Sequence, residues 1–288
     1  MERIWKYTFN KLLRVAPEDQ PILLAEVPLN PKENREKTTE VMFETFSVPS
    51  MYLANQAVLS LAASDHTTGI VLDIGEGACH SVPVHNGTAI QAAISRMDFS
   101  GNDLTIYLNN LLSKKYTFPW EKTPIIITLK EVLSCVALDF ASQTAKGAPG
   151  LEKSFQMPNG EVITLGEERF KCPEALFQPD LIGKKTKGVH ESTHESIMKC
   201  EEEVREGLYG NVLVCGGSTM FGGFAGRLEK ELVRLAPSKV KVNVIDPIEK
   251  KNAVWLGGSK MASTSSFQQM CISREEYDEA GVSIVHDK

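Results

Sequence analysis

Residues 69–87 read GIVLDIGEGACHSVPVHNG, a pattern that predicts a strand, a tight turn, a second strand and a closing hairpin turn. Gly75 and Gly77 let backbone N–H groups approach an anion closely. The carboxylates of Asp73 and Glu76 can hold a divalent cation, either directly or through water. This turn therefore suits a nucleotide phosphate, although an ordinary glycine-rich hairpin has the same pattern.

A second anion site is indicated further along the chain. The run NVLVC at residues 211–215 predicts a strand, and the loop GGSTMFGG at residues 216–223 leads from it into a helix predicted at 224–235. Free N–H groups and the helix dipole converge where such a loop enters a helix, so a bound anion is stabilised there. The chain thus carries two loops of the kind that holds phosphate groups.

The remaining elements follow from hydrophobic periodicity and from turn residues. Strands are expected at 22–27 and 240–245, a hairpin at 157–165, and helices at 2–14, 32–46, 51–63, 100–115, 192–206 and after the capping box that begins at Ser273. Residues 125–140 fit either a strand or a helix, and residues 171–190 predict a loop.

Gln56 is the conspicuous polar residue of the apolar segment 51–63. A buried amide needs hydrogen-bond partners, so Gln56 is either a satisfied core residue or a side chain that faces a cleft and orients a water molecule. The residues alone leave both interpretations open.

Composition narrows the class of protein. The chain has 288 residues, 42% of them hydrophobic, and a net charge of −6, which argues against nucleic acid as the main partner. Its six cysteines contain no Cys-x-x-Cys pair, so reduced thiols are expected rather than a disulfide framework or a zinc ribbon. No apolar run approaches membrane-spanning length, and we expect a cytoplasmic protein without membrane insertion.

Several long stretches of the chain resemble the actin family. They are LRVAPEDQPILLAEVPLNPKENREK, FETFSVPSMYLANQAVLSLAAS, EKSFQMPNGEVITLGEERFKCPEALFQP, CGGSTMFGG, VWLGGS and FQQMCISREEYDEAGVSIVH. The resemblance implies an α/β fold of the actin-like ATPase type, with two ribonuclease-H-like domains around a nucleotide cleft. It implies a small domain from residues 1–63 and 253–288, and a large domain from 64–252 in which residues 100–184 resemble the fourth subdomain.

The resemblance also implies site residues. Gln56 and His80 match the pair that positions the attacking water, and Asp73 matches the residue that helps hold the water shell of a magnesium ion. The other positions that match residues binding the nucleotide are Gly75, Glu76, Gly77, Gly101, Lys130, Glu131, Gly217, Ser218, Met220, Phe221 and Lys251.

Departures from the family pattern modify these expectations. Met1 aligns with an internal methionine, so we expect the small domain to lack its N-terminal strands, its second subdomain and one of two phosphate-binding hairpins. Asn102 and Ile127 each stand where the family has arginine, and the loop from Tyr116 to Pro124 has diverged. Weaker ATP binding, poor solubility and no self-assembly are the expected results.

Two functions are compatible with these features. The first is a cytoskeletal protein of the family that binds ATP or ADP with Mg²⁺, or with Ca²⁺, hydrolyses ATP slowly and forms filaments. The alternative is a truncated, non-polymerising protein with weak or no nucleotide turnover that acts through surfaces for actin or actin-binding proteins.

Overall fold

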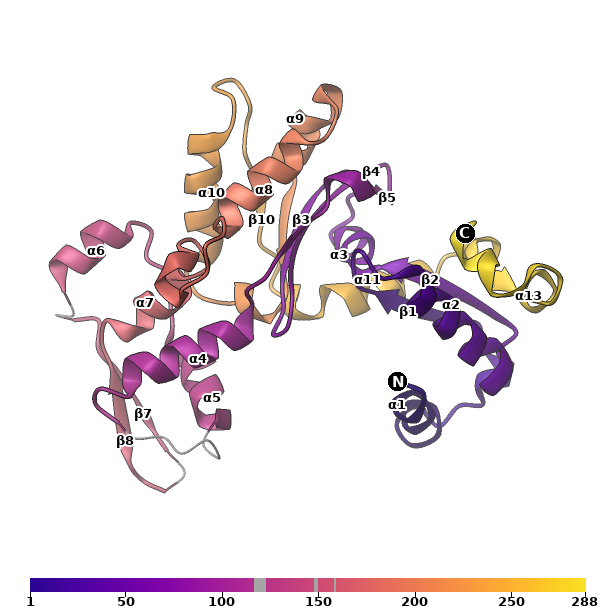
Figure 1. Ribbon diagram of the computed structural model, residues 1–288, viewed down its shortest axis with the longest axis horizontal. Coiled ribbons are helices and arrows are strands. Elements are labelled where there is room, and N and C mark those ends of the chain that lie inside the picture. Colours follow the sequence, from indigo (N-terminus) through magenta and orange to yellow (C-terminus); the bar gives the residue numbers. More distant parts are fainter. Residues whose placement is uncertain (117–122, 148–149, 158) are drawn as a thin grey trace. The chain divides into compact units, whose positions relative to one another are not determined.

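The computed structural model describes residues 1–116, 123–147, 150–157 and 159–288 (Figure 1). The chain divides into two compact units, a smaller one formed by Met1–His66 and Val254–Lys288 and a larger one formed by Thr67–Ala253. Among the described residues, no helix is long and apolar enough to cross a bilayer. Most of the divergent loop from Tyr116 to Pro124 lies outside the described residues, and so does Pro158 within the hairpin expected at 157–165.

The smaller unit is built on a three-stranded sheet in the order β1-β2-β11. Strand β2 (Ser50–Asn55) pairs in parallel with β1 (Ile22–Glu26) and antiparallel with β11 (Ile272–Ser273). The helices of this part of the chain are α1 (Glu2–Tyr7), which continues as a π-helical segment, α2 (Lys32–Glu40), α3 (Gln56–Ala63), α11 (Ala253–Ala262), α12 (Phe267–Met270) and α13 (Arg274–Ala280).

The helix expected at residues 51–63 is wrong in its first part, because residues 51–55 belong to strand β2 and helix α3 begins at Gln56. Asn55 ends the strand and caps the helix, since its side chain accepts a hydrogen bond of 2.9 Å from the Ala57 N–H. A continuous apolar run fits a buried central strand as well as a buried helix, and β2 pairs with strands on both sides. Tertiary pairing decides between the two.

The larger unit contains a six-stranded sheet in the order β10-β9-β3-β4-β5, with β6 also paired to β4. Its strands are β3 (Gly69–Ile74), β4 (Cys79–His85), β5 (Thr88–Ala89), β6 (Ser95–Met97), β9 (Val212–Cys215) and β10 (Val244–Ile245). The hairpin expected at residues 69–87 is present as the antiparallel pair β3 and β4. A separate hairpin consists of β7 (Lys153–Gln156) and β8 (Val162–Leu165).

The helices of the larger unit are α4 (Gly101–Leu112), α5 (Thr123–Leu133), α6 (Phe140–Lys146), α7 (Glu168–Glu174), α8 (Val189–Met198), α9 (Glu202–Gly210) and α10 (Phe224–Leu235). Helices α8 and α9 pack against β3 and β4, and α10 packs against α8 (Figure 1). One face of the sheet contributes Ile70, Leu72, Ile74, Val212 and Val214, all fully buried, to the core of this unit.

Three expectations for this unit need correction. The loop expected at 171–190 starts within helix α7, and the single helix expected at 192–206 is divided into α8 and α9. For residues 125–140, where strand and helix were both left open, the first part belongs to helix α5. Pro173 near the end of helix α7 cannot donate to the Arg169 carbonyl, which accepts from the Cys135 N–H at 3.0 Å instead. The strand expected at 240–245 shrinks to Val244–Ile245.

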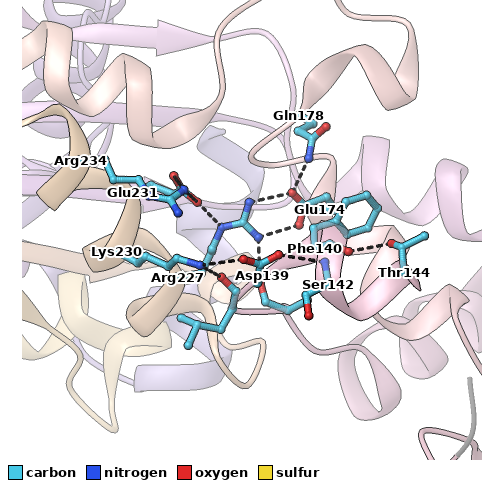
Figure 2. Close-up of polar contacts among 12 residues, drawn as sticks. Asp139, Phe140, Ser142, Thr144, Glu174, Gln178, Arg227, Lys230, Glu231 and Arg234 are labelled. Atoms are coloured by element: carbon cyan, nitrogen blue, oxygen red, sulfur yellow. Dashed lines mark hydrogen bonds and ion pairs between the residues drawn. The ribbon is translucent and has the colours of Figure 1, made fainter. Parts of the chain in front are cut away.

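A buried ion pair joins helices α7 and α10 (Figure 2). The Arg227 guanidinium donates two hydrogen bonds, of 2.9 and 3.0 Å, to the carboxylate of Glu174, which is fully buried. Arg227 also donates to Glu231 at 2.7 Å and to the Ala137 carbonyl at 2.8 Å. These bonds fix the segment that follows helix α5 against α10.

Candidate functional site

Four polar residues form a row across neighbouring strands of the larger sheet. Asp73 in β3 lies opposite His80 in β4 and beside Cys215 in β9, and His80 lies opposite Arg96 in β6. Side chains of directly paired residues point to the same face of a sheet. The row therefore brings a carboxylate, an imidazole, a thiol and a guanidinium together on one face, next to the turns that follow β3 and β9.

Asp73 is largely buried, and burial raises the pKa of its carboxyl group, while a hydrogen bond with Cys215 opposes this change. Gly216 follows Cys215 with φ of +89°, and a Cβ atom there would collide with Asp73 Oδ1 and with the Ile74 carbonyl. Only glycine satisfies both the left-handed backbone and this close approach. The loop at residues 216–223, which is the second predicted anion site, thus packs directly on the Asp73 carboxylate of the first site.

His80 is 5% exposed, and its Nε2 atom has no hydrogen-bond partner among the described residues. Burial, with a smaller contribution from the Arg96 charge, lowers the pKa of His80, so the imidazole is neutral at pH 7. A buried polar atom without a partner is unusual and costs free energy unless a water molecule or a ligand binds to it. The position of His80 is therefore suited to hold a water molecule beside Asp73.

The turn between β3 and β4 is locked to helix α4. The Gly75 carbonyl accepts from the Gly101 N–H at 2.9 Å, and the Glu76 carbonyl accepts from the Asn102 N–H at 2.9 Å and from Ser100 Oγ at 2.6 Å. The first N–H groups of α4 are thereby used inside the protein. Among the described residues, the backbone N–H groups of Gly77 and Ser218 have no backbone acceptor, so they remain available to an anion.

A cavity of about 340 Å³ opens beside this turn. Every residue that lines it belongs to the set expected from sequence to bind a nucleotide: Glu76, Lys130, Glu131, Gly217, Ser218, Met220, Phe221 and Lys251. These residues come from four separate segments of the chain, which the fold of the larger unit brings together.

Within the part of the chain that the structure describes, two larger cavities lie away from this turn. One of about 620 Å³ is formed by α1, β1 and α2 in the smaller unit, and one of about 510 Å³ lies near Arg227 and His190 in the larger unit. The Arg227 side chain is held by internal ion pairs, and neither cavity is lined by a glycine-rich loop. The smaller cavity beside the turn is therefore the better candidate site.

Lys130 is 2% exposed and reaches from helix α5 to the start of α4. Its Nζ donates to the Gly101 carbonyl and to Thr105 Oγ1, both at 2.8 Å, and forms an ion pair with Glu76 Oε2 at 3.3 Å. Gly101 itself packs beneath the turn, where a Cβ atom would collide with Ser218 Oγ and Glu76 Oε2. Gln56, the other expected catalytic residue, is half-buried as the first residue of α3 in the smaller unit.

A family model described as Actin matches residues 1–288. The chain belongs to the actin family. The mixed α/β architecture expected from sequence is confirmed with it.

An actin-family site implies a nucleotide and a divalent cation, and the donor set indicates how each would fit. Within the described residues, no group of three His, Cys, Asp or Glu side chains converges as a metal cage. Magnesium often binds through one carboxylate, retained waters and phosphate oxygens, so a single carboxylate at Asp73 is compatible with it. The free Gly77 and Ser218 N–H groups and the unpartnered His80 Nε2 fit a phosphate chain and an ordered water.

Sequence reasoning missed three residues that shape this site. Cys215 hydrogen-bonds to Asp73, Arg96 completes the row with its charge beside His80, and Thr105 supports Lys130. Thr105 lies four residues after Gly101 in a predicted helix, so helical spacing alone could have placed Thr105 on the same helix face as Gly101. The other two follow from strand register, which sequence does not specify between distant segments.

Proposed function

We propose that this actin-family chain binds ATP or ADP with Mg²⁺, or with Ca²⁺, at the β3/β4 turn and the adjoining cavity, and that it hydrolyses ATP slowly in a cytoskeletal role. The observation that supports this best is the cavity lined wholly by residues expected to bind a nucleotide. The unpartnered His80 Nε2 beside it supports the same proposal.

Each part of the site has a distinct role in this proposal. The N–H groups of Gly77, Gly217 and Ser218 would surround the phosphates, whereas the Gly75 N–H expected from sequence to join them already donates to the Ala78 carbonyl at 2.9 Å. Asp73 would hold the hydrated cation, which would neutralise phosphate charge. The glycine residues keep the backbone close enough for these contacts. The Met220 and Phe221 side chains form the wall against which a flat base packs.

His80 is the residue that can act on a water molecule. As a neutral imidazole with a free Nε2, it can accept a hydrogen bond from the attacking water. Phosphoryl transfer depends mainly on positioning and charge stabilisation, so a weakly basic histidine agrees with slow turnover.

Binding of labelled ATP in the presence of Mg²⁺ tests the proposal. Met220 is 48% exposed and lines the cavity, so Met220→Trp fills the cavity without disturbing the core. We expect the wild-type chain to bind ATP and Met220→Trp to bind it at least about tenfold more weakly. Val233→Trp, at a 56% exposed position on α10, serves as the matched control. The proposal is rejected if the wild type does not bind, or if Met220→Trp binds as tightly as Val233→Trp.

The non-polymerising alternative has an observation of its own. The loop between α7 and α8 contains Lys184 and Lys187, and these residues pair with Asp103 and Glu195 of the same unit. Burying this loop against another chain would remove its charged lysines from water, and no partner charge on the other chain is needed because both are already paired. These charges therefore oppose burial of the loop in a contact with another chain. Sedimentation in polymerising salt with Mg²⁺ and ATP separates the two functions. Filaments support the polymerising form, while retention of the chain on intact actin without filaments supports the alternative.

A further inference from the structure

The N-terminal segment, residues 2–14, is attached to the smaller unit along one side. It consists of α1, the π-helical piece Thr8–Leu13 and the cap residue Arg14. Phe9 is buried against Phe46, and Trp5 is partly buried against the same core. Side chains four residues apart are neighbours on a helix surface, so Trp5 and Phe9 mark the side of the segment that faces the core.

Other apolar side chains of this segment are exposed to water. Ile4 and Tyr7 are 60 and 58% exposed, and Leu12 and Leu13 are 64 and 58% exposed. Among the described residues, none of these four packs against either hydrophobic core. Uncovered apolar side chains bordered by charged residues are typical of a surface that binds a partner or a membrane.

The same segment carries a local excess of positive charge. Glu2 is its single acidic residue, and its basic residues are Arg3, Lys6, Lys11 and Arg14. All four basic side chains are exposed, and within the part of the chain that the structure describes none of them has an ion-pair partner. The chain as a whole has a net charge of −6, so this segment differs in sign from the rest of the protein.

Exposed apolar side chains beside unpaired cations suit a bilayer that contains anionic lipids. Its surface attracts basic side chains, and its interfacial region takes up apolar ones. A protein groove that encloses a helix needs access to several of its sides, whereas Trp5 and Phe9 keep one side of this segment against the core. The segment is also shorter than the roughly 20 residues of a spanning helix, so the contact is with the membrane surface.

We propose that residues 2–14 bind the surface of membranes that contain anionic lipids. The exposed apolar side chains enter the interface, and the four basic side chains contact the charged lipid headgroups. The inference is independent of the proposed nucleotide binding, because this segment belongs to the smaller unit and the cavity beside the β3/β4 turn belongs to the larger one.

Flotation of the purified full chain with lipid vesicles tests this proposal. We expect the chain to float with vesicles of phosphatidylcholine that contain about 30% phosphatidylserine, and not with vesicles of phosphatidylcholine alone. Lys6→Gln combined with Lys11→Gln should weaken binding at least about tenfold, since each basic residue near an anionic surface strengthens binding about fivefold. Leu12→Gln combined with Leu13→Gln should also weaken it at least about tenfold, because less apolar surface leaves water.

Two matched controls come from the larger unit. Lys239→Gln combined with Lys241→Gln removes two exposed lysines that have no ion-pair partner among the described residues. Val233→Gln combined with Ile248→Gln removes two apolar side chains that are 56 and 90% exposed. Both controls should float as the wild type does. Hydrogen exchange should show protection of peptides from residues 1–15 when anionic vesicles are added.

Several results would overturn the proposal. They are no flotation with anionic vesicles, equal flotation with neutral ones, the same loss of binding in test and control variants, and no protection of residues 1–15. Binding to calcium-loaded calmodulin, an acidic protein with an apolar groove, in the absence of vesicle binding would show that the segment recognises a protein instead. All substituted side chains are exposed, so the variants should fold, and their melting temperatures verify this.

Discussion

At the scale of single residues, the buried ion pair between Glu174 and Arg227 contributes strongly to the free energy of unfolding. Glu174 is fully buried and Arg227 is 6% exposed, and they share two hydrogen bonds (Figure 2). Removing one member of a buried pair leaves the other charge without compensation. The pair is therefore a sensitive point for the stability of the larger unit.

We expect Arg227→Met to lower the free energy of unfolding by about 3–5 kcal/mol, measured by urea denaturation. Lys230→Met is the control, since Lys230 is more exposed and pairs with Asp139 at 3.3 Å. Loss of that surface pair should cost less than about 1 kcal/mol. Adding Glu174→Gln to Arg227→Met should recover part of the loss, because it removes the unpaired charge. Equal effects of Arg227→Met and Lys230→Met would refute this account.

His190 and His194 make stability depend on pH. Burial lowers the pKa of both, the Arg227 charge adds to the effect at His190, and nearby glutamates oppose it at each. Because both pKa values are lower in the folded state than in the unfolded chain, protonation favours unfolding. The stability that the neutral imidazoles contribute is present above about pH 6.5 and is lost as the pH falls below that value.

The melting temperature of the chain should therefore fall between pH 7.5 and 5.5. His190→Gln and His194→Gln should each make this decrease smaller, since one titrating group is removed. His66→Gln, at a histidine in the smaller unit, is the control. If the melting temperature of both test variants falls with pH as steeply as that of the wild type, these histidines do not cause the pH dependence of stability.

At the scale of elements, the N-terminal helical segment has an amphipathic sequence, yet most of its apolar side chains are exposed. The helix expected at residues 2–14 is present, yet Ile4, Leu12 and Leu13 are 60, 64 and 58% exposed. Phe9 is the exception, at 6% exposed with its ring 5.2 Å from that of Phe46. This helical segment is attached to the core mainly through two aromatic side chains, the buried Phe9 and the partly buried Trp5.

Replacing both Leu12 and Leu13 with Gln should reduce aggregation, measured by light scattering, without lowering the melting temperature. Exposed apolar side chains contribute little to folding but favour association. Phe9→Ala is the contrasting variant and should cost about 3–5 kcal/mol, because it empties a buried aromatic position. A clear loss of stability in the double Gln variant would mean that the two leucines are packed in solution.

The elements differ in how well sequence predicts them, and the reason is where their stabilising contacts come from. The β3/β4 hairpin, α4 with its Ser100 cap and α13 with its Ser273 capping box depend on local signals, and they were predicted closely. Strand β2 and the break between α8 and α9 depend on distant partners, and they were missed. The cavity residues were found through family resemblance, while Cys215 and Arg96 become visible only once the fold pairs separate strands.

At the scale of the whole molecule, the cavity and the Asp73 row lie within the larger of two compact units. A ligand that binds only the folded state raises stability in proportion to the logarithm of its concentration. ATP with Mg²⁺ at 100 times its dissociation constant should therefore stabilise the larger unit by about 2.7 kcal/mol.

Hydrogen exchange with and without ATP and Mg²⁺ measures this effect separately for each unit. Peptides from β3, β4 and β9 should gain protection, and Met220→Trp should abolish the gain. Protection confined to β1 and β2 of the smaller unit, with none in β3 and β4, would contradict the assignment of the ligand to the larger unit.

The distribution of thiols offers a practical consequence. All six cysteines fall in the described part of the chain, and Cys79, Cys172, Cys200, Cys215 and Cys271 are buried, whereas Cys135 is partly exposed. The Cys135 backbone forms a bridge with Gly222, directly after Phe221 of the cavity wall. A maleimide fluorophore should thus react selectively at Cys135 of the natural sequence, which places an optical reporter beside the cavity without any engineered cysteine.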